Sequence, residues 1–367
     1  MTRYIPAALL AGACRLALAE PASLPALGAD LTRTTVSGLS SGAFMAAQLA
    51  TAYSSRFVGV GVIAGGPYYC AGTYPSQSLM ANATTTCMTP PIAAAGPDAG
   101  VSWIHANQFA EEGLIDPVSH IGRQRLYAFS GSGDRTVKTI VVDAVEKYYL
   151  KAGVPAARIL YNKSSPAGHA IVTKVDTDVP CAQTSAPYIN NCGFVQAHEL
   201  LRHLYGAGTR AANEATPAGQ LTAFSQSDFI DSKRASMDNV AYVYVPDVCK
   251  RESCAVHVAL HGCEQGASKI GDRYHGGTGY NQFADTNRLI ILYPQAVASA
   301  GIPANPKGCW DFWGYSTPTN TPPYDPGQPP FFAKGAPQMA AIVRMIDRLG
   351  LPRGTQPAVA APSANHP

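Results

Sequence analysis

The sequence predicts an α/β protein with a mostly parallel central sheet flanked by helices. Between residues 32 and 206, short apolar runs alternate with stretches of helical periodicity, which is the pattern of strand-helix-strand units. The same kinds of segment recur between residues 240 and 350. The chain has 367 residues, of which 46% are hydrophobic and 14% charged. It can therefore bury a large core, and it carries too few charges for a coiled coil or a charge-rich disordered protein.

In the first half of the chain, the predicted strands are short apolar or β-branched runs. They cover residues 34–36, 57–64 (FVGVGVIA), 126–130 (LYAFS) and 158–161. The predicted helices between and after them cover residues 42–53, 137–152 and 193–205. Strands that alternate with helices in this way are typical of a parallel sheet.

The second half follows a polar stretch at residues 207–238, which is either a domain boundary or a long excursion within one fold. Strongly β-branched runs at residues 240–246 (VAYVYVP) and 255–260 (AVHVAL) are expected to pair as a hairpin or as sheet neighbours. The remaining predicted elements are a helix at 280–286, a strand at 289–293 (LIILY) and an amphipathic helix at 336–349.

The N-terminal residues 1–19 are interpreted as a signal peptide. Arg3 lies in a short basic region, an apolar stretch covers residues 5–18, and residues 17–19 (ALA) form a small-x-small cleavage site. We therefore predict a secreted protein, extracellular or periplasmic. No later run approaches the ~18 consecutive apolar residues that would span a bilayer.

The C-terminal residues 352–367 are predicted to be a disordered tail, because the segment is rich in Ala and Pro and shows no apolar period. The formal net charge is only +3. This leaves no basic footprint for nucleic acid, so a nucleic-acid partner is not expected.

The cysteines fit an exported protein. Cys14 lies in the predicted leader, so eight cysteines remain in the mature chain, an even number that favours disulfides. Eight cysteines allow 105 pairings, among which sequence alone does not choose. Short spacing favours Cys181 with Cys192 and Cys249 with Cys254. No close CxxC-type pair is present, and we expect neither a metal nor a cofactor.

Residues 38–42 (GLSSG) match the GxSxG nucleophile elbow, in which a serine occupies a strained turn between a strand and a helix. Only small residues two positions before and after that serine let the chain pass without collision. A β-branched lead-in at 34–36 and an apolar helix at 43–52 put the motif in the required order. We predict that Ser40 is a nucleophile rather than part of a glycine-rich surface turn.

A serine nucleophile needs a histidine base, and the base needs a carboxylate that orients it, here in the chain order Ser, acid, His. Asp134 follows the strand at 126–130 through a flexible G-S-G turn, whereas Asp143 lies inside a predicted helix. His169 follows the next predicted strand in a loop, at the same edge of the sheet. The other histidines precede the acid or lie elsewhere, several of them in predicted helices or strands.

An oxyanion hole needs two backbone N–H groups, and the Ser41 amide is the first candidate. The second donor ordinarily lies upstream of the elbow, but only the leader and residues 20–39 precede Ser40. The downstream strand 255–260 ends in LHGC, and the amide of Cys263 could supply that donor. The sheet would then be circularly permuted; the alternative is that LHGC is a plain strand exit.

Six motifs together resemble the extracellular and periplasmic poly(3-hydroxybutyrate) depolymerases that carry the lipase box near the N-terminus. They are GLSSGAFMA around Ser40, GSGD at Asp134, AGH at His169, LHGC at Cys263, GYNQFAD at 279–285 and NPKGCWDFWGY at 305–315. The resemblance implies one circularly permuted α/β-hydrolase domain over residues 20–351. It also implies a serine esterase that cleaves short-chain polyhydroxyalkanoates to hydroxyacid monomers and oligomers through an acyl-enzyme.

The family's site residues carry over onto matching positions. The implied triad is Ser40, Asp134 and His169, and the implied oxyanion hole is formed by the amides of Ser41 and Cys263. Asn305 and Trp310 occupy the positions that contact the polymer in an open crevice. A disulfide between Cys263 and Cys309 would tie the oxyanion turn to that crevice.

Two other functions remain open. Feruloyl and acetyl-xylan esterases share LHGC and GYNQFAD, but their lipase box usually follows LHGC, whereas here it comes first. A polymer-binding protein with a dead site is the alternative from a different class, and a Ser, Asp and His in correct order argue against it. The sequence leaves the oligomeric state unknown.

Overall fold

The structure is a computed structural model that describes residues 21–213 and 215–356. The predicted signal peptide, Cys14 and residues 357–367 of the predicted tail lie outside the described residues. The first residues of that tail are described. They form a turn in which Thr355 N–H donates to Pro352 O, and Arg348 of helix α9 (Pro337–Gly350) donates to the carbonyl of Thr355.

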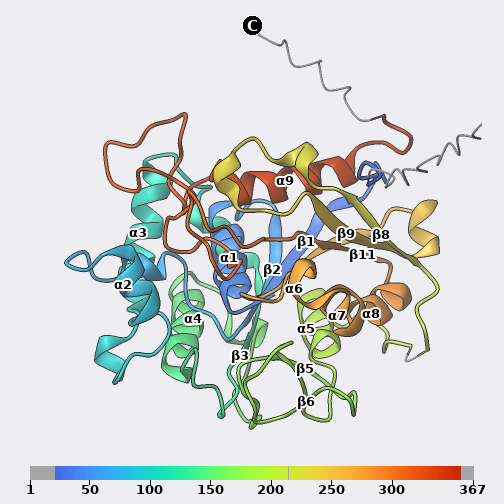
Figure 1. The fold of residues 1–367 in the computed structure, drawn as a ribbon, viewed down its shortest axis with the longest axis horizontal. Coiled ribbons are helices and arrows are strands. Elements are labelled where there is room, and N and C mark those ends of the chain that lie inside the picture. Colours follow the sequence, from blue (N-terminus) through green and yellow to red (C-terminus); the bar gives the residue numbers. More distant parts are fainter. Residues whose placement is uncertain (1–20, 214, 357–367) are drawn as a thin grey trace, which may run out of the picture.

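An eight-stranded sheet forms the centre of the fold, in the order β4-β3-β2-β1-β10-β11-β9-β8 (Figure 1). Its strands are β1 (Asp30–Leu39), β2 (Phe57–Ile63), β3 (Arg125–Phe129), β4 (Ile159–Asn162), β8 (Gln220–Ser225), β9 (Val240–Val245), β10 (Ala255–Leu260) and β11 (Leu289–Tyr293). The strands from β4 to β11 run parallel, while β9 and β8 add an antiparallel edge. The predicted mostly parallel sheet is confirmed.

The first strand of the chain lies in the middle of this sheet. β1 pairs with β2 on one side and with β10 on the other, with Gly38 opposite Leu260. The polar stretch at 207–238 contains β8, which pairs with β9 in the same sheet. Both halves of the chain therefore build one sheet, and their junction lies at the end of β1, where the predicted nucleophile follows.

One expectation about strand pairing is wrong. β9 and β10 are neither a hairpin nor neighbours, because β11 lies between them, parallel to β10 and antiparallel to β9. Every residue of β10 is buried, as befits a strand with parallel partners on both sides. Apolar periodicity identifies such a strand but does not identify its partners. The disulfide Cys249–Cys254 lies in the connection between β9 and β10.

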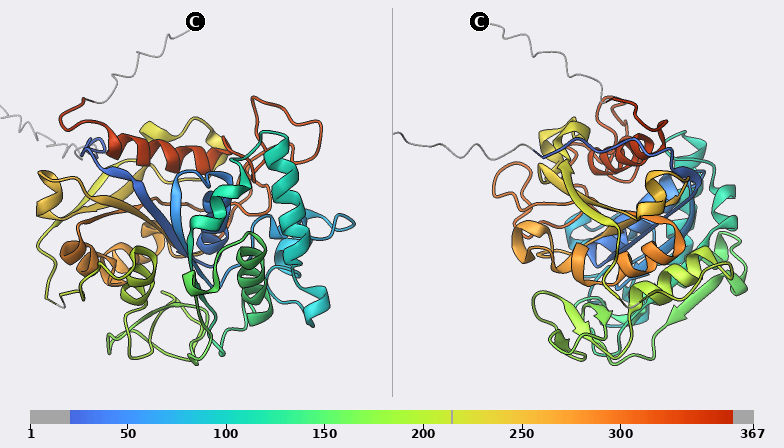
Figure 2. Two further views of the ribbon diagram at one scale, coloured as in Figure 1. Left: turned by 180° about the vertical axis from the view of Figure 1, so that it is seen from behind. Right: turned by 90° about the vertical axis from the view of Figure 1, so that its right-hand side faces the viewer.

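The predicted helices are confirmed to within a few residues. They are α1 (Ser41–Ala52), α4 (Thr139–Lys151), α5 (Gln196–Tyr205), α8 (Tyr280–Asn287) and α9. α9 lies on one side of the sheet, and α5, α8 and the short α7 (Arg273–Gly277) lie on the other (Figures 1 and 2). α1 is buried along its whole length, which its small and apolar side chains permit.

Several elements carry no strong sequence pattern and were not predicted. These are α2 (Leu79–Thr84), α3 (Ala99–Glu111), α6 (Ala267–Ile270), α7 and a second small sheet of β5 (Ile171–Thr173), β7 (Ile189–Asn191) and β6 (Val179–Pro180). The small sheet follows His169 directly. The predicted disulfide Cys181–Cys192 connects the segments that follow β6 and β7, and its formation is confirmed together with Cys249–Cys254.

Candidate active site

Ser40 occupies a tight turn between β1 and α1. Its backbone angles, φ 57° and ψ −123°, lie in a region that non-glycine residues rarely adopt. The flanking glycines make the turn possible. A Cβ at Gly38 would lie 2.3 Å from the carbonyl oxygen of Gly42, and a Cβ at Gly42 would lie 2.4 Å from His261 O. The steric reason for the GxSxG motif therefore applies to this chain.

Asp134 and His169 lie in loops that follow the neighbouring strands β3 and β4. Glycine allows the two loops to touch, because a Cβ at Gly131 would lie only 2.1 Å from Ala167 O. Gly133 N–H donates to the same carbonyl at 3.1 Å. The turn that carries the carboxylate thus packs directly on the loop that carries the imidazole.

The carboxylate of Asp134 orients the His169 ring. His169 Nδ1 lies 2.7 Å from Asp134 Oδ2, and both residues are 5% exposed. The other carboxylate oxygen accepts N–H groups from Thr136 at 2.8 Å and Val137 at 2.9 Å. With Nδ1 occupied, Nε2 is the ring nitrogen left for chemistry.

Ser40, His169 and Cys263 line one pocket of about 220 Å³. Its remaining walls are formed by Leu39, Met88, Thr136, Thr184, Tyr188, Gly262, Glu264, Gln265 and Lys307. Within the part of the chain that the structure describes, no hydrogen bond joins Ser40 Oγ to His169. Such nucleophile-to-base bonds often tighten only when substrate binds. Ser40, His169 and Cys263, which the sequence predicts as site residues, therefore line the same cavity.

The two predicted oxyanion donors lie beside Ser40. Ser41 begins α1, where N–H groups have no intrahelical partner. The Gly38–Leu260 register brings the end of β10 to the elbow, so that a Cβ at Gly262 would lie 3.4 Å from Ser40 Cβ. Among residues 21–213 and 215–356, neither the Ser41 N–H nor the Cys263 N–H has an acceptor. Neither N–H group is therefore committed to another hydrogen bond within the described residues.

The predicted disulfide Cys263–Cys309 is confirmed, with 4.2 Å between its Cα atoms. It joins the turn after β10 to the segment before Trp310. Trp310 N–H donates to Ser41 Oγ at 3.2 Å, and the Trp310 indole Nε1–H donates to His261 O at 3.0 Å. The segment around Trp310 therefore braces both candidate donor positions.

The expected substrate contacts, Asn305 and Trp310, do not fit a polymer-binding surface. Asn305 is 1% exposed, Trp310 has no exposed surface, and neither lines the pocket. The Asn305 amide donates to Cys309 O at 2.9 Å and to Tyr315 OH at 3.0 Å. Both side chains are thus buried, and their hydrogen bonds connect neighbouring segments inside the protein. A motif shows the residue type at a position, but the exposure of that position depends on what packs over it.

Sequence reasoning missed several residues of the pocket wall. Met88, Thr184, Tyr188 and Lys307 line it, yet they come from three loops, of which the one between β6 and β7 carries both Thr184 and Tyr188, and no common motif includes them. Thr184 Oγ1 accepts the backbone N–H of His169 at 2.9 Å. Only the folded chain brings these residues together.

A buried histidine connects the two strands beneath the elbow. The ring nitrogens of His257 lie 2.7 Å from Thr35 Oγ1 and 2.8 Å from Ser37 Oγ, so this side chain of β10 is held against β1. Ser37 Oγ also lies 2.7 Å from Tyr280 OH. Burial lowers the pKa of His257 to about 3. The ring is therefore neutral at neutral pH and serves as a fixed crosslink between strands.

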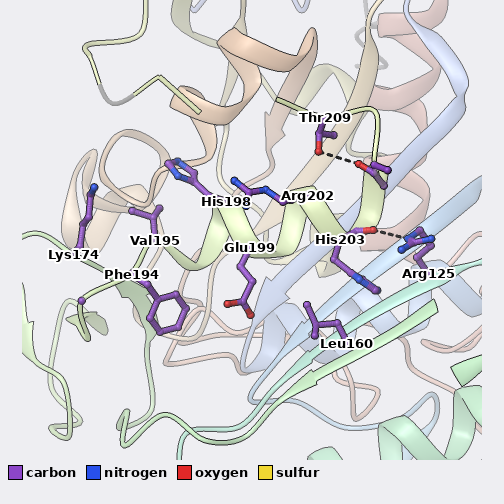
Figure 3. A pocket seen from close by; sticks show the side chains of 13 residues that line it. Arg125, Leu160, Lys174, Phe194, Val195, His198, Glu199, Arg202, His203 and Thr209 are labelled. Atoms are coloured by element: carbon purple, nitrogen blue, oxygen red, sulfur yellow. Dashed lines mark hydrogen bonds between the residues drawn. The ribbon is translucent and has the colours of Figure 1, made fainter. Parts of the chain in front are cut away.

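A larger cavity of about 660 Å³ lies along α5 and contains none of the predicted site residues (Figure 3). Its lining includes Arg125, His198, Glu199, Arg202 and His203. Arg125 Nε donates to His203 O at 2.5 Å, which directs this guanidinium to the backbone of α5 (Figure 3). Size alone does not make this cavity the site of chemistry, because it has no serine nucleophile.

The described residues contain no group of three or more His, Cys, Asp or Glu side chains placed to hold a metal ion. None of the helices in the described ranges combines the length and hydropathy needed to cross a membrane.

Comparison with curated proteins finds named relatives, although no protein-family model matches the chain. The chain is 42% identical over 331 residues to the poly(3-hydroxybutyrate) depolymerase of Delftia acidovorans, covering 89% of this chain and 61% of that protein. It is 38% identical over 306 residues to the polyhydroxybutyrate depolymerase of Talaromyces funiculosus, covering 80% of this chain and 85% of that protein. The chain thus spans about three fifths of the Delftia protein and most of the Talaromyces protein.

Two solved structures share the fold, each with a TM-score of 0.76 and covering 89% of this chain and 98% of the other. One, 33% identical, is a PHB depolymerase with a serine-to-alanine substitution, complexed with an R3HB trimer. The other, 34% identical, is the PHB depolymerase from Penicillium funiculosum. The predicted α/β-hydrolase class, with a mostly parallel sheet between helices, is confirmed.

Proposed function

Because the chain belongs to the poly(3-hydroxybutyrate) depolymerase family, we propose that it is a serine esterase that hydrolyses poly(3-hydroxybutyrate) and related short-chain polyhydroxyalkanoates to hydroxyacid monomers and oligomers. One observation carries the proposal. His169, hydrogen-bonded to Asp134 through Nδ1 at 2.7 Å, shares one pocket with Ser40 and Cys263. A serine, an oriented base and a turn with an unpaired amide are the parts that acyl transfer requires.

In the first step, Ser40 Oγ attacks the ester carbonyl carbon while His169 Nε2 takes the serine proton. Asp134 keeps the imidazole in the Nδ1–H tautomer and stabilises the imidazolium that forms. The carbonyl oxygen becomes an oxyanion. It accepts hydrogen bonds from the N–H groups of Ser41 and Cys263, which are rigidly placed before the reaction begins.

The tetrahedral intermediate then collapses. The bond from carbonyl carbon to ester oxygen breaks, and His169 Nε2 returns its proton to the departing hydroxyl end of the polymer. The acyl group remains on Ser40. Water, deprotonated by His169, attacks the carbonyl carbon of this acyl-enzyme. The bond from that carbon to Ser40 Oγ then breaks, His169 returns the proton to Ser40, and the second product leaves with a new carboxyl end. The pocket of about 220 Å³ suits a short acyl unit.

The proposal also covers where the enzyme acts and how its chain is arranged. Four disulfides within the described residues, together with the predicted leader, support a secreted enzyme. The central place of β1 between β2 and β10 supports a circularly permuted chain whose catalytic domain extends over residues 20–351. Neither half of that domain contains both the triad and the Cys263 turn.

The test is the clearing of an amorphous poly(3-hydroxybutyrate) suspension by the wild type, Ser40→Ala and Ser76→Ala, an exposed serine that serves as the matched control. We expect clearing by the wild type and Ser76→Ala only. Clearing that persists in Ser40→Ala would contradict the nucleophile assignment. Methyl ferulate and acetylated xylan are assayed in parallel, and release from either without polymer clearing would favour the second esterase class.

A further inference from the structure

His261 lies between the end of β10 and the turn that carries Cys263, and it has no exposed surface. Both of its ring nitrogens are occupied. The backbone N–H of Ala296 donates to Nε2 at 3.1 Å, and Nδ1 lies 2.6 Å from the carbonyl oxygen of Gly262. Because Ala296 is the donor, Nε2 carries the lone pair. The ring proton must then be on Nδ1, which donates to Gly262 O.

We propose that His261 is a positioning residue that aims the Cys263 N–H at the reacting carbonyl. This inference rests on the proposed function, in which that N–H stabilises the oxyanion. The peptide that joins Gly262 to Cys263 is planar, so its C=O and N–H point in opposite directions when it is trans. A hydrogen bond that holds the Gly262 carbonyl toward the interior therefore turns the Cys263 N–H toward the pocket.

The rest of the turn supports this role. Gly262 N–H donates to Gln265 Oε1 at 2.8 Å, and the Gln265 amide is itself held by the carbonyls of Pro187 and Tyr188. The carbonyl of His261 accepts the Trp310 indole N–H. Among the described residues, the carbonyl of His261 and both backbone groups of Gly262 thus have partners, and the Cys263 N–H has none.

The environment also keeps the ring in one form. The pKa of His261 is lowered to about 4, mainly by burial; the Gly262 carbonyl opposes this effect and the neighbouring His275 adds to it. A second ring proton would have to be on Nε2, where it would clash with the N–H group that Ala296 donates to that nitrogen. The single Nδ1–H donor of His261 therefore persists at neutral pH.

Two substitutions separate this role from simple packing. In His261→Asn, the side-chain amide nitrogen takes the approximate place of Nδ1 and can still donate to Gly262 O. In His261→Gln, the amide lies nearer the place of Nε2; it can accept from Ala296 N–H but leaves Gly262 O without its donor. His275→Gln is the control. His275 is also buried, stacks on Tyr242 and, among the described residues, makes no hydrogen bond to the turn; its removal would only relieve the smallest of the effects on the pKa of His261.

The readout is kcat and KM on a soluble hydroxybutyrate oligomer, normalised to active sites titrated with a phosphonate. We expect His261→Gln to lose about 10²-fold in kcat with little change in KM, since one oxyanion donor contributes ~10² to 10³. We expect His261→Asn to retain most of the wild-type kcat, and His275→Gln to match the wild type per active site. Equal losses in both His261 variants, or no loss in His261→Gln, would overturn the inference.

A measurement on the unaltered protein covers the case in which the variants do not fold. Nitrogen-15 NMR of labelled histidine should show His261 as the neutral Nδ1–H tautomer from pH 5 to 8, and an Nε2–H tautomer would refute the proposed geometry. Ser40→Ala separates the two proposals. If it hydrolyses the oligomer, the proposed function fails; if it is inactive while the His261 variants behave alike, only the role of His261 fails.

Discussion

Gly131 packs against Ala167 so tightly that a Cβ at position 131 would stand 2.1 Å from the Ala167 carbonyl oxygen. This contact docks the turn that carries Asp134 on the loop that carries His169, and their side chains meet at 2.7 Å. The alignment of the hydrogen-bonded pair Asp134 and His169 thus depends on the absence of a methyl group at position 131.

Replacing Gly131 with Ala should push the two loops apart. Overpacking of this kind costs ~1 to 3 kcal/mol of stability, and a displacement of about 1 Å at a catalytic group lowers kcat roughly 10²-fold. Urea unfolding and oligomer hydrolysis would measure both effects. Gly301→Ala, at an exposed glycine with nothing within 4 Å, should change neither. A fully active Gly131→Ala would show that the loops tolerate separation.

Asp134→Asn should remove the charge that holds the His169 tautomer while keeping the shape of the side chain. By analogy with other serine hydrolases, kcat should fall about 10⁴-fold with the fold intact. Asp143, the competing acid, lies on α4 and accepts the Tyr161 hydroxyl and the Lys163 ammonium group. Asp143→Asn should stay within about twofold of the wild-type rate, because partly exposed ion pairs contribute little. A larger loss of kcat in Asp143→Asn than in Asp134→Asn would assign the catalytic role to Asp143.

Loss of the Cys263–Cys309 bridge should impair the enzyme more than loss of Cys249–Cys254. The first bridge closes a sequence separation of 46 residues and the second only 5. The chain-entropy model assigns these loops about 4 and about 2 kcal/mol of stability. Paired Cys→Ser variants, compared by thermal unfolding and by kcat, should show a larger loss of both for the first pair. An equal or reversed order would mean that this bridge does not hold the oxyanion turn.

Trp310→Phe tests whether this buried indole has a structural role. The variant loses the bond from Nε1 to His261 O, which should cost about 1 to 3 kcal/mol of stability and lower kcat through the turn. KM for a soluble oligomer should stay close to the wild-type value. A large rise in KM with unchanged stability would restore Trp310 as a substrate contact.

Stability should depend on pH through His257. Burial lowers its folded-state pKa to about 3, whereas an unfolded histidine titrates near the ordinary value of 6.5. The unfolded state therefore binds the proton more readily, and below pH 6.5 the free energy of unfolding falls by about 1.4 kcal/mol for each pH unit. Above pH 6.5 this contribution is constant. Urea unfolding of His257→Gln between pH 4.5 and 7.5 should show a slope shallower by that amount; identical slopes would place the protonation elsewhere.

The placement of Ser40, Asp134 and His169 could be predicted because the backbone features that place them are local. The backbone of Ser40 demands small neighbours, and those glycines stand in the sequence on both sides of it. Asp134 follows the buried strand β3 and His169 follows the half-buried edge strand β4, each through a loop, so that parallel strand order places them at one edge of the sheet. The position of each residue relative to the sheet could be predicted because strand ends, turns and helices have recognisable residue patterns in the sequence.

Other features had no such pattern. Nothing in the run at 255–260 indicates that β11 rather than β9 lies beside it, because a fully buried strand is apolar whatever its neighbour. The burial of Asn305 and Trp310 results from packing against distant segments, including the His261 carbonyl. Met88 and Tyr188 reach the pocket through separate loops.

Sequence by itself determined the class of sheet, the GxSxG turn, the chain order of Ser40, Asp134 and His169, and the even number of cysteines after residue 20. These features depend on residue type, spacing and local backbone geometry. Only the tertiary structure decided which side chains face the pocket, which histidine contacts Gly262 O, and that Trp310 is buried. The physical reason is that exposure and hydrogen-bond partnership are properties of contacts between segments far apart in the chain, and residue patterns do not encode those contacts locally.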